Sequence, residues 1–345
     1  MTDAKPPIKA VLLPGDGIGP EISDSVLKVF ESLGNPVDFR VCEAGERAFE
    51  GPTGDALPED TVAAIRERGL ALKGPLATPK GGGYRSATVR MREALDLFAN
   101  VRPATTILPG RYDGIDILLF RENLEGLYVG REHYIRVGDD PHGVGVGIGI
   151  NTKEGMRRFL RHSFDEAVRL GRKKVTVVHK ANILKVLTGV FLEAAQELAP
   201  EYEGRIEIDD MIVDACAMNL VLRPERFDTI VTTNLFGDIL SDLTAGLVGG
   251  LGLAPGANVG EKAAIFEAVH GTAPDIAGQG LANPTALLLA AAMLLEHAGR
   301  HDDARAIRDA VTTTIRDGNG TRDIGGPNGT AAFTDAVIDN LGGAR

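Results

Sequence analysis

Cysteine is nearly absent from this sequence of 345 residues, which contains only Cys42 and Cys216. Two cysteines are too few for a disulfide framework or for a cysteine-ligated zinc site. So little cysteine fits a reducing compartment. We therefore expect a cytoplasmic protein.

Long apolar runs and an excess of positive charge are also missing. No stretch approaches the roughly 18 uninterrupted apolar residues of a membrane span. Residues 1–17 have neither the apolar core of a signal peptide nor an arginine-rich leader, so we expect no targeting segment. The net charge of −11 argues against nucleic acid or an anionic membrane as a partner. It does not exclude an anionic small molecule, since a local arginine cluster can dominate the field in one cleft.

Apolar runs that read as strands alternate with segments of helical spacing, and this pattern predicts an α/β fold. The expected strands are residues 9–13, 114–120, 174–178, 206–213 and 229–233, and the expected helices are residues 21–33 and 286–298. The last of these is apolar on nearly every face, which predicts a helix buried in a core or in a subunit interface. Residues 127–150 differ, because they combine β-formers with many glycines. They predict a protruding hairpin arm, which is marginal alone and needs a partner chain.

The segment GDGIGPE, residues 15–21, lies between an expected strand and an expected helix. Its glycine spacing is G-x-G-x-G, whereas the Rossmann fingerprint requires G-x-G-x-x-G. The segment is therefore either a dinucleotide loop or only a tight turn before a helix. No other Rossmann fingerprint or Walker loop occurs, so a nucleotide would be held by a different scaffold.

Residues 74–103 combine a glycine-rich loop, hydroxyl side chains at an expected helix start, and arginines. Ser86 and Thr88 at such a start form an anion site together with backbone N–H groups. Arg92 lies within the helix and Arg102 beyond it, while Arg121 follows at the end of a strand. Forked guanidinium groups bind carboxylates bidentately, so three of them suit a di- or tricarboxylate. A solvated surface role is the alternative for each arginine.

Two further groups of polar residues are candidates for catalysis. Asp238 and Asp242 are four residues apart on an expected helix and share a face, and Asp214 follows an apolar stretch. Oxygen ligands of this kind favour magnesium or manganese over zinc, with surface solvation as the alternative. Lys180, at a strand end, is a candidate base or a surface lysine, and Tyr128 is a proton donor or a core residue.

Asp275 lies in the polar, glycine-rich loop of residues 267–284. A carboxylate accepts hydrogen bonds from a ribose 2′-hydroxyl and repels a 2′-phosphate, which selects NAD over NADP.

Together these segments resemble the isocitrate/isopropylmalate dehydrogenase family of β-decarboxylating enzymes. The resemblance covers the whole chain in order: GDGIGPE, GPLATPKGGGYRS, ANVRP, RENLEGLY, VHKAN, NLFGDILSD, VHGTAPDIAGQGLANP and TRDIGG. It implies a two-domain α/β fold with a twisted mixed sheet, no Rossmann topology and a β clasp arm. Residues 1–97 plus 249–345 would form a large, cofactor-side domain, and residues 98–248 a small domain that includes the arm at 127–150.

The resemblance also implies a role for each candidate residue. The substrate carboxylates would be bound by Ser86, Thr88, Arg92, Arg102 and Arg121. Tyr128 and Lys180 would be catalytic, and Mg²⁺ or Mn²⁺ would be held by Asp214, Asp238 and Asp242. NAD would be bound by Thr78, Glu267, His270, Gly271, Asp275, Ile276 and Asn283. Lys180 and Asp214 would reach into the site of a neighbouring subunit, so a homodimer or larger oligomer with shared active sites is implied.

The expected reaction is the metal- and NAD-dependent oxidative decarboxylation of isocitrate, a tricarboxylate. Members that act on isopropylmalate carry apolar residues at the helix start, whereas residues 85–88 here are polar. The isocitrate pattern is Ser-x-Asn, and Thr88 replaces the Asn, so homoisocitrate and 3-isopropylmalate remain alternatives. A non-catalytic regulatory subunit and a simple carboxylate-binding module are the other readings, and Arg90 has no assigned role.

Overall fold

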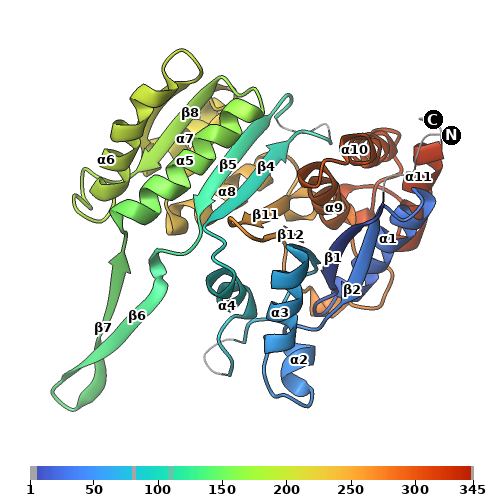
Figure 1. Ribbon diagram of the computed structural model, residues 1–345, viewed down its shortest axis with the longest axis horizontal. Coiled ribbons are helices and arrows are strands. Elements are labelled where there is room, and N and C mark those ends of the chain that lie inside the picture. Colours follow the sequence, from blue (N-terminus) through green and yellow to red (C-terminus); the bar gives the residue numbers. More distant parts are fainter. Residues whose placement is uncertain (1–5, 80–82, 109, 111, 343–345) are drawn as a thin grey trace. The chain divides into compact units, whose positions relative to one another are not determined.

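A computed structural model describes residues 6–79, 83–108, 110 and 112–342 of the chain (Figure 1). The chain divides into two compact units. The first comprises Met1–Leu97, Thr106–Asp113 and Val248–Arg345, and the second comprises Phe98–Thr105 and Gly114–Leu247. In the part of the chain that the structure describes, no helix is long and apolar enough to cross a membrane.

The first unit is built on a mixed sheet. Its strands, in spatial order, are β2 (Val37–Val41), β1 (Ile8–Leu13), β3 (Leu70–Lys73), β12 (Ala264–Ala268) and β11 (Pro255–Val259). All neighbours are parallel except β11, which is antiparallel to β12. This order is not that of a Rossmann sheet, as expected.

Helices cover this sheet. They are α1 (Gly19–Ser32), α2 (Glu46–Glu50), α3 (Glu59–Arg68), α4 (Ala87–Ala94), α9 (Thr285–His297), α10 (His301–Arg316) and α11 (Thr330–Gly342). The apolar helix α9 packs against β11, β12, α1 and α10, so it is buried on almost every side. This confirms the prediction of a core helix from residues 286–298.

The second unit repeats the same arrangement with different elements. Its main sheet has the order β4 (Ala99–Thr105), β5 (Asp116–Glu122), β10 (Thr229–Thr232), β8 (Lys174–His179) and β9 (Glu207–Ile212). Only the pair β4 and β5 is antiparallel. The helices are α5 (Lys153–Arg169), α6 (Gly189–Leu198), α7 (Val213–Leu222) and α8 (Asn234–Leu247).

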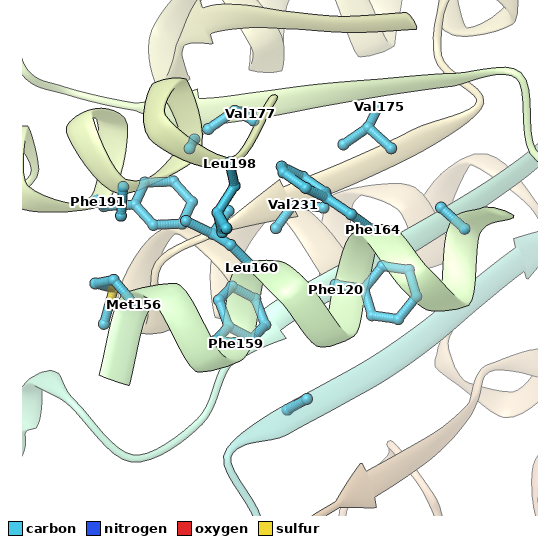
Figure 2. Close-up of a cluster of buried hydrophobic side chains, with 14 of the residues drawn as sticks. Phe120, Met156, Phe159, Leu160, Phe164, Val175, Val177, Phe191, Leu198 and Val231 are labelled. Carbon is cyan, nitrogen blue, oxygen red and sulfur yellow. The ribbon is translucent and has the colours of Figure 1, made fainter. Parts of the chain in front are cut away.

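The core of the second unit lies where α5 and α6 pack on the sheet (Figure 2). Thr152 caps the start of α5 by accepting the N–H of Gly155 at 3.1 Å. Met156, Phe159 and Leu160 then follow with helical spacing and are fully buried. Strand residues alternate between the two faces, so Phe120 points into this core while Arg121 points away from it, toward α8.

The predicted arm is a two-stranded antiparallel hairpin of β6 (Gly126–Val137) and β7 (Asp140–Ile150). It extends away from the rest of its unit (Figure 1). Large apolar side chains are exposed along it, among them Tyr134, Val137 and Ile148. The chain reverses at Gly138, whose φ of 58° favours glycine.

The GDGIGPE segment is a tight turn that joins loops of the first unit. A side chain at Gly17 would collide with the carbonyl oxygen of Thr272, so the glycine permits close backbone approach. Asp16 is buried, and its Oδ2 accepts the N–H groups of Glu46 at 3.0 Å and Ala77 at 2.8 Å. The segment therefore forms a tight turn before α1, with its glycines at points of close backbone approach.

Candidate active site

The second unit carries a cluster of charged residues centred on α8. Asp238 and Asp242 lie one helical turn apart on α8, after its first turn. Arg121, near the end of β5, pairs through Nη1 with Oδ1 of Asp238, and the Tyr128 hydroxyl donates to Oδ2 of the same carboxylate. Tyr128 lies at the base of the arm. Four candidate residues, separated by up to 121 positions in sequence, are thus close together.

The Arg121 guanidinium is fixed by neighbours that the sequence did not predict. Asn234 Oδ1 accepts from Nε at 3.2 Å and from Nη2 at 2.8 Å, so the planar fork is held along one edge. A side chain at Gly237 would place its Cβ 2.5 Å from Cγ of Arg121, so only glycine leaves room for it. The guanidinium also lies 5.1 Å from the centre of the Tyr128 ring. Long-range contacts of this kind leave no local signal in the sequence.

Arg102 approaches the same helix from β4. Its Nε donates to Asn100 Oδ1 at 2.7 Å, and its Nη1 donates to Ser241 Oγ at 2.7 Å. The same Nη1 lies 3.5 Å from Oδ1 of Asp242. Arg102 and Arg121 are both buried, so two buried guanidinium groups lie against the acidic face of α8.

Neighbouring charges change the proton affinities in this cluster. Burial and the charge of Asp238 raise the pKa of Asp242, while Arg102 opposes that shift. Burial, followed by the hydrogen bond to Asp238 and the charge of that carboxylate, raises the pKa of Tyr128. The phenol is therefore fully protonated at neutral pH and remains able to donate its proton.

Lys180 and Asp214 form a second group in the same unit. Lys180 follows β8, Asp214 lies in the first turn of α7 after β9, and these parallel strands are neighbours, so their carboxyl ends meet. The Lys180 ammonium pairs with Oδ1 of Asp214. This hydrogen bond lowers the pKa of Asp214. Among the described residues, no three His, Cys, Asp or Glu side chains are gathered closely enough to hold a metal ion.

In the first unit, Arg92 and Glu267 belong to one buried charge network. Glu267, on β12, lies 2.8 Å from Lys73 Nζ and 3.5 Å from Nη2 of Arg92, and it accepts from Asn258 at 2.7 Å. Burial raises the pKa of Glu267, but the charges of Lys73 and Arg92 and the two hydrogen bonds outweigh it and hold that pKa at about 2. Lys73 was not among the predicted site residues. Its position at the end of an apolar strand was the available signal.

We expect Glu267→Gln to lower the free energy of unfolding more at pH 6 than at pH 3. The folded-state pKa of about 2 lies below the ordinary 4.5, so ionisation stabilises the fold above pH 4.5, and this stabilisation is lost as the pH falls toward 2. The shift corresponds to about 3 kcal/mol. Urea unfolding followed by circular dichroism measures it. Glu197→Gln, which weakens the surface ion pairs with Lys153 and Arg157, is the control with little effect. An equal loss at both pH values would contradict the prediction.

The start of α4 carries the predicted anion-binding hydroxyls. Ser86 is the N-cap and accepts the N–H of Val89 at 3.5 Å, and Thr88 is half-buried on the first turn. Arg90, which had no predicted role, makes a two-pronged ion pair with Asp55. Thr78 is exposed in the preceding loop. Residues 80–82 of the glycine-rich loop lie outside the described residues.

The remaining candidate residues lie on the loop between β12 and α9. His270 Nδ1 lies 3.0 Å from the Gly271 carbonyl oxygen, so this nitrogen carries the proton and donates it. Its Nε2 is then an acceptor, and it is buried without a partner within the described part of the chain. Burial lowers the pKa of His270, so the ring is neutral at pH 7.

The far part of this loop is tied to a short helical turn, η5 (Arg322–Ile324). Asn283 Nδ2 donates to Asp323 at 3.0 Å, and Asn283 is buried. Asp275 and Ile276 lie in another turn, η4 (Pro274–Ile276), where Asp275 is exposed and Ile276 half-buried. The loop thus presents a carboxylate and a buried acceptor on a backbone anchored at several points.

The profile of the isocitrate/isopropylmalate dehydrogenase family matches residues 9–340. The chain therefore belongs to this family of β-decarboxylating dehydrogenases. It is 44% identical to "Isocitrate dehydrogenase [NAD] catalytic subunit 5, mitochondrial" of Arabidopsis thaliana, over 97% of this chain and 89% of the relative. It is 46% identical to the 3-isopropylmalate dehydrogenase of Archaeoglobus fulgidus, over 96% of this chain and 99% of the relative.

A solved structure has the same fold. The crystal structure of isocitrate dehydrogenase from Methylococcus capsulatus aligns with a TM-score of 0.92 and 51% sequence identity, covering 96% of this chain and 99% of the other. The fold predicted from the resemblance, a mixed α/β architecture of this family, is therefore confirmed.

Proposed function

We propose that the protein catalyses the NAD- and divalent-metal-dependent oxidative decarboxylation of isocitrate to 2-oxoglutarate and carbon dioxide. The observation that carries the proposal is the cluster in which Arg102, Arg121 and Tyr128 meet Asp238 and Asp242. The cluster combines two guanidinium groups that can bind carboxylates, a protonated phenol, and two carboxylates that can serve as oxygen ligands of a metal ion. The reaction requires each of these groups.

The polar start of α4 favours isocitrate over 3-isopropylmalate. Ser86 and Thr88 offer hydroxyl groups there, and an isopropyl group would leave them without partners. The Arabidopsis relative is named for isocitrate and the Archaeoglobus relative for 3-isopropylmalate, so similarity alone does not choose between them. Homoisocitrate, one methylene longer, is the second candidate, because Thr88 replaces the expected Asn.

Each proposed catalytic residue has a separate role in substrate binding or proton transfer. Arg92, Arg102 and Arg121 bind and orient the substrate carboxylates. Lys180, supplied by a second copy of the chain, takes the proton of the substrate hydroxyl. Tyr128 protonates the enol carbon after carbon dioxide has left, since its raised pKa keeps the phenol protonated. When bound, NAD supplies the hydride acceptor, and Mg²⁺ or Mn²⁺ supplies charge that stabilises the developing negative oxygen.

The residues present fit both the divalent metal ion and NAD. Asp238 and Asp242 offer hard carboxylate oxygens one helical turn apart, and burial together with the charge of Asp238 raises the pKa of Asp242, so a cation bound there would stabilise the charged pair. In the proposal, Asp214 of a second copy completes the metal site. For NAD, the unpartnered Nε2 of His270 is an acceptor for a hydroxyl or amino group of the adenosine half. Thr78, Glu267, Gly271, Ile276 and Asn283 remain proposed cofactor residues.

Two exposed apolar surfaces support assembly of two copies. One is the arm, which as a free hairpin would be marginally stable. The other is the packed pair α7 and α8, where Met218, Leu222 and Ile239 are each more than half exposed. Groups of exposed large apolar side chains are typical of interaction surfaces. We therefore propose a homodimer or larger assembly. A cytoplasmic location stays a prediction.

We expect kcat/KM to favour NAD over NADP by at least about a hundredfold, or about 2.7 kcal/mol. The reason is Asp275, whose exposed carboxylate would accept from a ribose hydroxyl and repel a 2′-phosphate. Asp275→Lys should narrow the preference, and Asp302→Lys, on the exposed start of α10, is the matched charge control. Equal efficiency with both cofactors in the wild type would refute the assignment.

A steady-state comparison of isocitrate, homoisocitrate, 3-isopropylmalate and D-malate with NAD and Mn²⁺ tests the function. The proposal expects the highest kcat/KM with isocitrate. A higher kcat/KM with homoisocitrate or 3-isopropylmalate would assign that acid as the substrate in place of isocitrate, within the same enzyme family. No turnover with any of the four, together with measurable isocitrate binding, would favour the regulatory subunit or the carboxylate-binding module.

A further inference from the structure

We propose that His179 and Asp210 form a positioning pair that fixes the backbone beside Lys180. The inference rests on the proposed function, in which Lys180 acts as the base. His179 is the last residue of β8 and immediately precedes Lys180, and it is only 5% exposed. Asp210 lies on the neighbouring strand β9.

Both ring nitrogens of His179 are engaged. Nδ1 accepts a hydrogen bond from the backbone N–H of Ala181 at 3.0 Å, and Nε2 lies 3.0 Å from Oδ2 of Asp210. Because Nδ1 accepts, the ring proton must be on Nε2, which donates it to the carboxylate. Asp210 therefore selects the tautomer that can accept from Ala181. The two hydrogen bonds therefore fix the orientation of the ring and its tautomer.

The bond to Ala181 completes the fixation of one peptide plane. The N–H of Ala181 and the C=O of Lys180 belong to the same peptide unit. The carbonyl accepts from the N–H of Ile183 at 3.0 Å and from that of Leu184 at 2.8 Å, and the N–H is held by His179. Both polar atoms of the plane are therefore bound, which fixes the direction in which the Lys180 side chain leaves the backbone. A base must be held within a narrow geometry for efficient proton transfer, so this fixation supports kcat.

The strand β9 offers a matched control beside Asp210. Asp209 is its neighbour in sequence, and successive strand residues point to opposite faces. Asp209 pairs with Lys174 at 2.7 Å, so it serves an ion pair at the other end of β8. Asp209→Ala removes a carboxylate from the same strand without touching His179. Its loss is expected to leave kcat unchanged.

Two substitutions at position 179 separate the contacts. Asparagine places an amide oxygen near the position of Nδ1, so His179→Asn retains the acceptor for Ala181. Glutamine reaches toward Asp210 instead, so His179→Gln loses that acceptor. We expect His179→Gln to lower kcat by about tenfold to a hundredfold. The KM for isocitrate and the KM for NAD should each stay within about twofold of the wild type. His179→Asn should stay within about threefold, and Asp210→Asn, which still accepts from Nε2, should be less impaired than Asp210→Ala.

Amide hydrogen exchange provides a readout that does not depend on turnover. The Ala181 amide should lose protection in His179→Gln and keep it in His179→Asn, while thermal midpoints of the two variants stay alike. Equal kcat for His179→Gln and His179→Asn, or equal protection of the Ala181 amide in both, would refute the proposed positioning role of His179 and Asp210. If the wild type fails to turn over any of the four acids while Ala181 shows the expected exchange pattern, the proposed function fails and the positioning geometry stands.

Discussion

A refolded equal mixture of Lys180→Met and Tyr128→Phe should regain about a quarter of wild-type activity, although each variant alone is inactive. In the proposal, Tyr128 acts in the site of its own chain and Lys180 in the site of the partner. Random pairing makes half of the dimers heterodimers, and each of these has one intact site and one doubly damaged site. The measurement is specific activity after unfolding and joint refolding, with subunit exchange verified by differently tagged chains.

A second mixture is the matched control. Lys180 and Asp214 pair within one chain and are proposed to serve the same neighbouring site. Mixing Lys180→Met with Asp214→Asn therefore leaves every site with one damaged residue, and activity should not recover. Recovery in this control, or none in the first mixture despite exchange, would refute the shared site.

The sequence predicted those elements whose signal is local. The strand at Ile8–Leu13 and the helix at Thr285–His297 have apolar patterns that allow only buried placement, and both formed as expected. The arm was predictable because β-formers and glycines alternate there without an apolar face of helical spacing. The strand Ala99–Thr105 was not foreseen, since Pro103 interrupts its pattern and its pairing with β5 is a tertiary contact.

The candidate site was predictable as a set of residues and not as a set of contacts. Arg121, Tyr128 and Asp238 were chosen for their chemistry, and the structure brings these three together. Asn234, which holds the Arg121 guanidinium, was missed because its role depends on a contact across 113 positions. Lys73 was missed although it ends an apolar strand, because its partner Glu267 lies on the neighbouring strand β12 but 194 positions away in sequence.

Removal of divalent cations should abolish turnover, and Mg²⁺ or Mn²⁺ should restore it. Asp238→Asn should raise the Mn²⁺ concentration for half-maximal activity by at least about tenfold, because a charged oxygen ligand is replaced by a neutral one. Asp339→Asn, on the exposed side of α11, is the control with no expected change. The measurement is a Mn²⁺ titration of initial rate in a metal-buffered solution.

Asp238 also contacts Arg121 and Tyr128, so its substitution could act through these neighbours. A role as metal ligand and a role in orienting Arg121 predict different results in the Mn²⁺ titrations. If Asp238 serves only to orient Arg121, Asp238→Asn weakens isocitrate binding and leaves the Mn²⁺ midpoint unchanged at saturating substrate. If it is a metal ligand, the Mn²⁺ midpoint shifts at every isocitrate concentration. Asp242→Asn discriminates further, because Asp242 faces Arg102 at 3.5 Å and should shift the Mn²⁺ midpoint in the same direction. Full activity of the wild type in excess chelator would contradict a metal role for either aspartate.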